Sequence, residues 1–449
     1  MQNKNYLINR VTFATGLFLT LLFLFSYSLG FAFYNYILLL GVVFMALPFI
    51  PNLVRAEKNF FLFLIMLLML LLILFRNNTL YGGTLRSSLA TMSGIILFFM
   101  LKNSSYWQKS FIKWVIIFSV ISYTIGIFFL LFPNLLISHF VPLMNLDLKY
   151  TRKLMTMISN GYMTGIANHY SLMGMYMALG SIAVFSQYFV LNDNGRISFR
   201  SKGWFPSALM MLGCFLTGKR AHFLFTLGAL FVMYVVLTTR IKMKTVLKFF
   251  GATIFSVLVV YIIIRMGAFG NILSRYFRES ADLNSLSSNR LDRLWVPALY
   301  FFRQHPIFGI GWKNFSLNAR SLEMYFDAYE GLDAHNVYIQ LLAETGVIGF
   351  GVFMSFFIYN MTAIIKTAKV GGYLQRIAAV SFGGNRAVPV APIAFSLGYQ
   401  VFFLVYCLTG NPLYDSACVL PYFFACSMGI FWHSRTKSAA TRGIVSLGL

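Results

Sequence analysis

The chain has 449 residues, of which 59% are hydrophobic, 18% aromatic and only 11% charged. A soluble domain of this composition would lack the polar groups to cover its surface, so the sequence indicates an integral membrane protein. The formal net charge of +24 is spread over short segments between apolar stretches. Such scattered charge does not form the basic face of a nucleic-acid-binding protein, and we expect no nucleic-acid partner.

Apolar segments recur along the whole chain. A helix needs roughly 20 apolar residues to cross a bilayer, and the hydropathy pattern predicts about twelve such spans. They lie near residues 11–29, 31–50, 59–75, 87–101, 112–132, 168–190, 203–217, 221–238, 245–264, 342–365, 391–408 and 418–433. The predicted fold class is all-α: one polytopic membrane domain over residues 1–449, with about 12 transmembrane helices. The first span lacks a small-residue cleavage site, so we expect a retained helix.

The charges between the spans predict the orientation. Placing the N-terminus inside leaves 21 of the 36 basic residues in inner segments, as the positive-inside rule requires. Both termini are then cytoplasmic. Residues 265–335 form one large, partly helical periplasmic loop, whose stretch from Arg265 to Ala334 holds eight basic and seven acidic residues.

Two helices are predicted near this loop. The apolar spacing from Asn289 to Arg303 predicts an amphipathic helix that Pro306 ends. A second helix begins at Asp333, which we expect to act as its N-cap, and stops at Gly346.

Some basic residues lie in outer segments, against the orientation bias. Lys219 and Arg220 occupy a very short connection between two apolar spans. They either extend to lipid phosphate or face a central anionic ligand. The other outer cations considered are Lys149, Arg152 and Lys153, and, in the long loop, Arg290 and Arg293. Because a polyanion needs several convergent cations, the whole set favours the ligand interpretation.

His335 lies where the long loop ends and a helical pattern resumes. It is either a structural hydrogen-bonding residue or a general base. A nearby helix N-terminus disfavours the imidazolium and keeps the ring neutral, as a base requires. Asp333 could orient the ring or only cap the helix, while Asn336 and Gln340 add polar groups. The other histidines and the four cysteines lack metal-ligand spacing, so we expect neither a metal nor a cofactor.

Three motifs between about 205 and 355 resemble bacterial O-antigen ligases. The first is His335-Asn336, nine residues, then Gly346-Val347-Ile348-Gly349, which matches their pattern H-[NSQ]-x9-G-x-x-[GTY]. The second is Arg220-Ala221-His222-Phe223-Leu224, which matches their R-x3-L. The third, Asn289-Arg290-Leu291-Asp292-Arg293-Leu294-Trp295 with His305-Pro306-Ile307-Phe308-Gly309-Ile310-Gly311, resembles the loop signature that ligases share with O-antigen polymerases. Lys219 departs from the serine that is common before the motif arginine.

The resemblance implies an inverting, metal-independent glycosyltransferase of the GT-C type, with its active site on the periplasmic face of the bacterial inner membrane. It would be an O-antigen ligase, moving O-antigen glycan from undecaprenyl diphosphate to the lipid A-core oligosaccharide during lipopolysaccharide biosynthesis. Its partners would be that donor, that acceptor and membrane lipid. Carried onto this chain, His335 is the general base, and Arg220 and Arg290 bind the diphosphate and assist catalysis. The loop charges add Lys219, Arg293, Lys149, Arg152 and Lys153 as further diphosphate contacts.

Other functions remain open at this point. Arg320 and Gly331 fit the R-x10-G pattern of polymerases, but only once, so an enzyme joining two undecaprenyl-diphosphate-linked repeats stays an alternative. A relative that glycosylates a protein would share the same donor chemistry. A transporter with twelve helices is also conceivable, but the sequence has no internal repeat and almost no acidic residue within a span.

Overall fold

The computed structural model describes residues 2–26, 34–49, 82–191 (apart from 145, 147 and 168), 197–238, 294–319, 333–369 and 390–441, and the isolated residues 247, 251 and 258. Its α-helices are α1 (Gln2–Ser26), α2 (Tyr34–Ala46), α5 (Gly82–Leu101), α6 (Gln108–Leu131), α7 (Pro133–Leu135), α8 (Leu148–Ser159), α9 (Tyr170–Ser186), α10 (Trp204–Leu216), α11 (Arg220–Leu237), α15 (Val296–Gln304), α16 (Phe315–Asn318), α17 (Val337–Lys369), α19 (Val390–Tyr406) and α20 (Ser416–Thr441). Shorter turns are the 3-10 helices Leu47–Phe49, Val141–Leu143, Ser201–Gly203 and Pro412–Tyr414 and the π-helix Leu136–Phe140.

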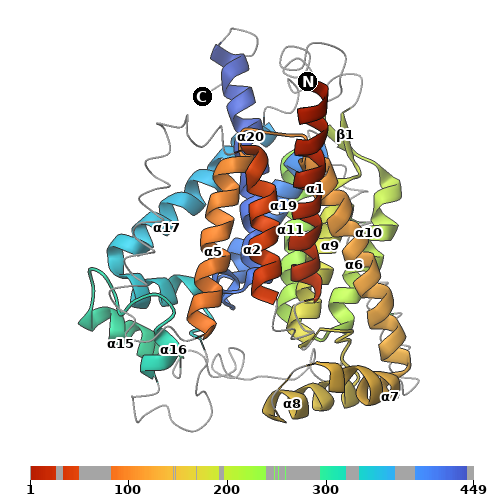
Figure 1. Ribbon diagram of the computed structural model, residues 1–449, viewed down its shortest axis with the longest axis vertical. Coiled ribbons are helices and arrows are strands. Elements are labelled where there is room, and N and C mark those ends of the chain that lie inside the picture. The colour runs from red at the N-terminus through yellow and green to blue at the C-terminus, as the bar shows by residue number, and fades with distance from the viewer. Residues whose placement is uncertain are drawn as a thin grey trace.

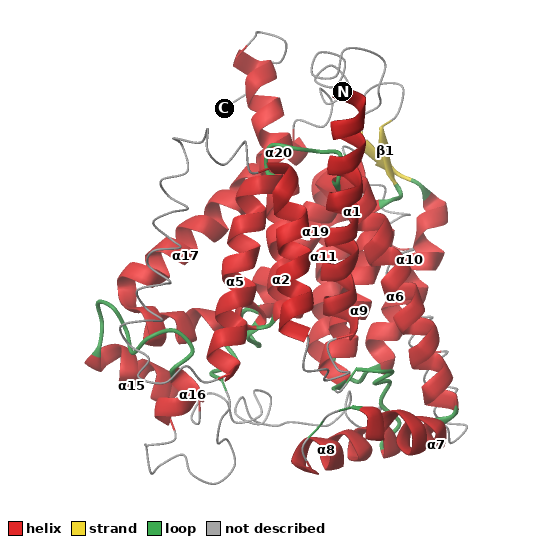
Figure 2. Ribbon diagram, viewed as in Figure 1, coloured by secondary structure: helices red, strands yellow, loops and turns green. Residues whose placement is uncertain are grey.

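The long helices run side by side as a bundle (Figure 1). Its upper end in that view carries both described chain ends, at Gln2 and Thr441, and we call it the terminal end. The short helices α7, α8, α15 and α16 lie at the opposite end, which we call the site end. Figure 2 shows that helices make up almost all of the described chain.

Several helices are suited to a bilayer. Four are long and apolar enough to cross it: α6, α11, α17 and residues 416–438 of α20. Ten of the twelve predicted spans coincide with the described helices α1, α2, α5, α6, α9, α10, α11, α17, α19 and α20. The predicted spans near 59–75 and 245–264 lie outside the described residues, apart from three isolated positions. The helical membrane class is confirmed, while the total of twelve spans and the outer location of the long loop stay predictions.

Helices α9 and α19 form the centre of the bundle. All residues of α9 from Leu172 to Ser186 are buried, as expected for a helix that is apolar on every side. Around α19, the Tyr399 hydroxyl donates to the carbonyl of Cys418 on α20 over 3.0 Å. The indole of Trp432 on α20 donates in turn to the Gln108 side chain on α6, also over 3.0 Å. These two side chains thus form hydrogen bonds between helices rather than facing an apolar environment unpaired.

The connection between α9 and α10 adds a short β-hairpin, which the sequence did not predict, to the otherwise helical fold. Strand β1 (Phe189–Leu191) pairs antiparallel with β2 (Ile197–Phe199), and Phe189 lies opposite Phe199. The Phe199 ring packs 4.4 Å from that of Phe185 and 4.9 Å from that of Trp204, between ring centroids. Aromatic residues suit a pleated, half-buried surface, and here they pack the hairpin against α9 and α10 at the terminal end.

The long loop contains helices. The described part of the helix predicted from Asn289 to Arg303 is helical: a π-helical turn at Leu294 and Trp295 leads into α15, which ends at Gln304. Residues 289–293 lie outside the described residues. The predicted stop at Gly346 coincides with a break in α17: Gly346 has φ 62° and ψ −169°, which are not helical, and a second helical segment continues from this kink to Lys369.

Candidate functional site

His335 occupies an unusual backbone conformation at the start of α17. Its φ is 52°, in the left-handed region that few residues other than glycine adopt. Its neighbours hold it there: the Trp295 indole donates to the Ala334 carbonyl over 3.1 Å, and the Ala334 amide donates to the Gln340 side chain over 3.0 Å. On the other side, the Val337 amide donates to the carbonyl of Cys407 over 2.8 Å. The direction of the half-buried His335 side chain is therefore set by backbone anchored on both sides.

The predicted cap at Asp333 is wrong. The side-chain oxygen of Asn336 accepts from the amides of Tyr338 (3.0 Å) and Ile339 (3.2 Å), which makes Asn336 the capping residue of α17. Asp333 instead forms an ion pair with Lys313 and accepts from Gln340 over 3.3 Å. The Asp333 carboxylate therefore links Lys313, in the loop after α15, to Gln340 on α17.

The motif glycines lie where that loop crosses the bend of α17. A Cβ built on Gly346 would lie 2.2 Å from the carbonyl oxygen of Ile307, and one built on Gly309 would lie 2.3 Å from the carbonyl carbon of Glu344. Both glycines also have positive φ, 66° at Gly309. The Val347 amide donates to the Pro306 carbonyl over 2.8 Å. The motif around Gly309 and the motif around Gly346 are thus in direct backbone contact, and only residues without a Cβ fit there.

Glu344 is a central residue that the sequence motifs did not identify. It is fully buried, and its carboxylate accepts four hydrogen bonds: from the Lys313 amide (2.8 Å), the Phe315 amide (3.1 Å), the Gln340 side chain (2.9 Å) and the Tyr414 hydroxyl (2.7 Å). It is the only acidic residue in α17. That isolation in an apolar helix was the available signal, since buried carboxylates in such helices need specific partners.

Two residues between α19 and α20 complete this network. Burial raises the pKa of the Tyr414 hydroxyl well above its usual range, and the neighbouring Glu344 carboxylate raises it further. Tyr414 is therefore a stable donor to Glu344. Burial also raises the pKa of Asp415, whose carboxylate accepts from the Ala417 amide over 2.9 Å at the start of α20. The connection between α19 and α20 is thus held to α17 by Tyr414 and to the start of α20 by Asp415.

Lys219 and Arg220 occupy a tight turn between α10 and α11. Gly218 in this turn has φ 70°, and a Cβ there would lie 2.9 Å from the Tyr162 ring. The Lys219 ammonium lies 5.9 Å from the centroid of the Tyr170 ring. Arg220 is the first residue of α11 and is partly exposed. The turn is therefore rigid, and it presents two consecutive cations.

The end of α19 brings this turn close to the start of α17. The ring of His222, in the first turn of α11, lies edge-on to that of Tyr406 at 4.6 Å between centroids. The next residue, Cys407, accepts the hydrogen bond from Val337. The two motifs that hold Arg220 and His335 therefore contact consecutive residues at the end of α19, Tyr406 and Cys407.

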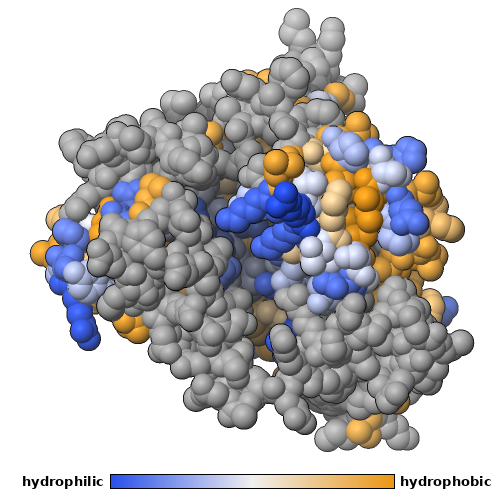
Figure 3. Space-filling view, turned by 90° about the horizontal axis from the view of Figure 1, so that it is seen from below, coloured by the Kyte–Doolittle hydropathy of each residue, from blue (hydrophilic) through white to orange (hydrophobic). Residues whose placement is uncertain are grey.

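The other predicted cations divide into two groups. Arg152 and Lys153 are exposed on α8, which lies at the site end (Figure 1). Arg290 and Arg293 lie outside the described residues. Seen from this end, the surface is hollowed near its middle, and hydrophilic side chains gather beside the hollow (Figure 3). Lys149 is likewise exposed on α8, so the structure places five of the seven predicted diphosphate-binding cations at one end of the bundle, together with His335.

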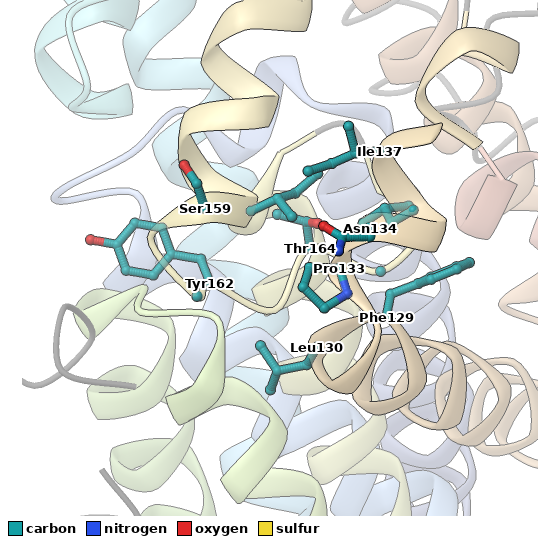
Figure 4. A pocket seen from close by; sticks show the side chains of 12 residues that line it. Phe129, Leu130, Pro133, Asn134, Ile137, Ser159, Tyr162 and Thr164 are labelled. Carbon is teal, nitrogen blue, oxygen red and sulfur yellow. The ribbon is translucent and has the colours of Figure 1, made fainter. Parts of the chain in front are cut away.

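A cavity of about 270 Å³ lies between the end of α6 and the segment after α8. Figure 4 shows Phe129 and Asn134 on one side and Ser159 and Tyr162 on the other. Its lining combines apolar rings with hydroxyl and amide groups. Because Tyr162 also contacts the turn at Gly218, the cavity adjoins the Lys219 and Arg220 pair. In the described part of the chain, no three His, Cys, Asp or Glu side chains gather as metal ligands would.

The fold and this site define a helical membrane protein that carries a group of polar and charged side chains at the site end of an apolar bundle. Residues 205–354 match the family model described as O-antigen ligase. This match confirms the resemblance to the O-antigen ligase family that the motifs predicted. It covers the α10–α11 turn, the described part of the long loop, and the start and bend of α17.

A curated relative agrees with this assignment. The exopolysaccharide production protein ExoQ of Rhizobium meliloti is 24% identical over 239 residues. The match covers 51% of this chain and 50% of the relative, so the chain spans about half the length of that protein. The aligned 239 residues are more than the family model matches, which is residues 205–354.

Proposed function

We propose that this protein is an O-antigen ligase. It moves glycan from undecaprenyl diphosphate to the lipid A-core oligosaccharide, in the bacterial inner membrane with both termini cytoplasmic and the site end periplasmic. The observation that carries the proposal is the position of His335. Its side chain extends from an anchored left-handed backbone at the start of α17, at the same end as Lys219 and Arg220.

His335 acts as the general base in this proposal. Its ring accepts the proton of the acceptor hydroxyl, and the hydroxyl oxygen attacks the anomeric carbon from the side opposite the diphosphate. The new glycosidic bond forms as the bond to the diphosphate oxygen breaks, so the configuration inverts and the electron pair leaves with undecaprenyl diphosphate. A base two residues before a helix N-terminus is kept neutral by the helix dipole, which suits proton acceptance.

The cations stabilise the leaving group. A diphosphate gains negative charge as the bond breaks, and fixed cations in a partly dry site lower the energy of that state. Arg220 and Arg290 have this role by family resemblance, while Lys219, Arg293, Arg152 and Lys153 add positive charge. The cavity beside Tyr162 offers the mixed apolar and polar lining that suits an amphiphilic donor.

The unusual backbone at His335 supports a functional role. Left-handed geometry at a residue with a side chain costs free energy, on the order of 1–3 kcal/mol, and persists only where surrounding contacts enforce it. Here the hydrogen bonds of the Ala334 carbonyl and amide and of the Val337 amide hold the His335 backbone in this geometry. Such strain concentrates at functional sites, which favours a base over a purely structural histidine.

A second candidate is a polymerase that extends one lipid-linked glycan with another. The name of the matched relative favours it, because an exopolysaccharide production protein makes a polymer. The donor side of the reaction would be unchanged. Only the acceptor would differ, being a second undecaprenyl-diphosphate-linked glycan instead of the lipid A-core.

The test offers both acceptors to the purified protein together with undecaprenyl-diphosphate glycan. Transfer to the lipid A-core supports the ligase, and chain extension supports the polymerase. His335→Ala should lower the initial rate by about 10²- to 10⁴-fold. His139→Ala is the matched control, because His139 is exposed at the same end and bonds to the adjacent Ser138 over 2.6 Å. A folded protein that makes neither product would overturn both proposals.

A further inference from the structure

A second, larger cavity lies at the terminal end, away from His335. It has a volume of about 690 Å³ and is bordered by the start of α6, by β1, by Arg200 and by the start of α19. In the part of the chain that the structure describes, its lining contains three cations, Lys109, Lys113 and Arg200, and no acidic side chain. All three are exposed, and among the described residues none of them takes part in an ion pair. The cavity is thus electropositive.

One face of α6 lines the cavity, with charge above and apolar surface below. Lys109 and Lys113 lie one helical turn apart, and Ile116 and Ile117 continue the same face toward the middle of the bundle, while Ile112 lies level with Lys113. Each turn of an α-helix advances about 5.4 Å, so Ile116 and Ile117 lie about one turn below Lys113 and about two turns below Lys109. This order corresponds to the charged headgroup and the acyl chains of a lipid.

The two lysines are unfavourably placed without an anion. Like charges one turn apart repel each other, and cations at a helix N-terminus oppose the helix dipole. Lys109 is the second residue of α6, so both penalties apply to it. A bound anion would remove the first penalty and would itself interact favourably with the helix N-terminus.

The cavity also faces the region where lipid is expected. Only 28% of the apolar window of α6 is buried within the protein, so α6 lies at the edge of the bundle. Val120 and Ile121, 45% and 49% exposed, continue its outer surface below the cavity. A ligand in the cavity would therefore be continuous with lipid around α6.

We propose that this cavity binds one anionic phospholipid of the leaflet at the terminal end. Its phosphate lies between Lys109, Lys113 and Arg200, and an acyl chain follows Ile116 and Ile117. Positive charge near a membrane surface attracts anionic lipid generally, but here three cations surround a shaped, partly apolar cavity. The site is independent of the transfer reaction proposed above.

The test measures phospholipid binding to the purified full-length protein. After delipidation in a neutral detergent, phosphatidylglycerol or phosphatidylcholine is titrated and bound lipid is counted by native mass spectrometry. The wild-type protein should retain a first phosphatidylglycerol in preference to phosphatidylcholine. Lys109→Gln with Lys113→Gln should weaken that binding roughly tenfold or more, whereas the double arginine variant should keep it.

The matched control removes the same charge elsewhere at the same end. Lys366 and Lys369 are exposed in the last turn of α17 and do not line the cavity. Their double glutamine variant should bind phosphatidylglycerol as the wild type does. Equal losses in the two double variants would show only a general charge effect and would overturn the site.

Two further measurements separate a lipid from a free phosphate and do not depend on how the variants fold. Soluble glycerophosphoglycerol should fail to displace phosphatidylglycerol from the wild-type protein, because it lacks acyl chains to fill the apolar part. A photoreactive phosphatidylglycerol should label peptides containing residues 109–117 or 187–200. Displacement by the soluble headgroup at equal concentration, or labelling confined to other helices, would contradict the proposal.

Discussion

The Tyr414 hydroxyl donates a hydrogen bond of 2.7 Å to the carboxylate of Glu344, which lies 70 residues earlier in the chain. This bond joins the connection between α19 and α20 to the helix that begins beside His335. The same carboxylate accepts from the Lys313 and Phe315 amides, so three separate segments meet at one buried charge.

Tyr414→Phe should therefore destabilise the protein while preserving the ring packing on Trp312. Loss of one hydrogen bond to a buried charged group lowers the free energy of unfolding by about 1.5–3 kcal/mol. Unfolding in mixed detergent and sodium dodecyl sulfate measures the change. Tyr359→Phe is the control, since Tyr359 on α17 is 57% exposed and should show no loss. Equal stability of the two variants would rule out a stabilising role for the bond.

Gly346→Ala should be more disruptive than an ordinary glycine substitution. The added methyl group would lie 2.2 Å from the Ile307 carbonyl oxygen, on a backbone with φ 62°. We expect a loss of about 2 kcal/mol or more of unfolding free energy, together with reduced activity.

Gly351→Ala is the control in the same helix. A Cβ there meets nothing within 4 Å, and alanine is the better helix former by about 1 kcal/mol. Its stability should be unchanged or slightly higher. If Gly346→Ala behaved in the same way, the contact between the loop at Ile307 and the bend of α17 would be unimportant.

At His335, stability and activity should respond differently to substitution. Both His335→Gly and His335→Ala remove the proposed base, so both should transfer glycan about 10²- to 10⁴-fold more slowly than the wild type. Glycine adopts φ 52° without steric cost, so the glycine variant should be more stable than the alanine variant by about 1 kcal/mol. Comparing their unfolding curves isolates the backbone term, because both lack the imidazole. An alanine variant as stable as the glycine variant would mean that the backbone there carries no strain.

Arg220→Ala should reduce glycan transfer by about 10²- to 10³-fold, the typical effect of losing one group that stabilises developing negative charge. Arg220→Lys should retain part of the activity, because the lysine ammonium keeps the positive charge but lacks the several N–H donors of the guanidinium group. Arg435→Ala serves as control: Arg435 is exposed on α20 and lies 5.3 Å from the Phe431 ring centroid, away from the site end. Initial rates with saturating acceptor would decide. Wild-type rates for Arg220→Ala would remove this residue from the site.

Hydropathy in the sequence was sufficient for most of the helices. The predicted spans near 112–132 and 391–408 correspond to α6 and α19 within a few residues. Such predictions succeed because a membrane helix satisfies its own backbone hydrogen bonds, so its existence depends on local composition. The strands at 189–199 escaped prediction because they rest on aromatic contacts with Phe185 and Trp204 on neighbouring helices.

In the site, too, some features could be predicted from the sequence and others depended on tertiary contacts. The order of residues alone identified His335, Arg220 and the two glycines at 346 and 349, since a motif requires only spacing. Tertiary structure decided that Asn336 and not Asp333 caps α17, because Lys313 already holds the Asp333 carboxylate. It also revealed Glu344, whose partners lie from 4 to 70 residues away along the chain. Local composition specifies which segments are helical, but the pairing of a buried charge depends on which segments meet, and only the folded chain determines that.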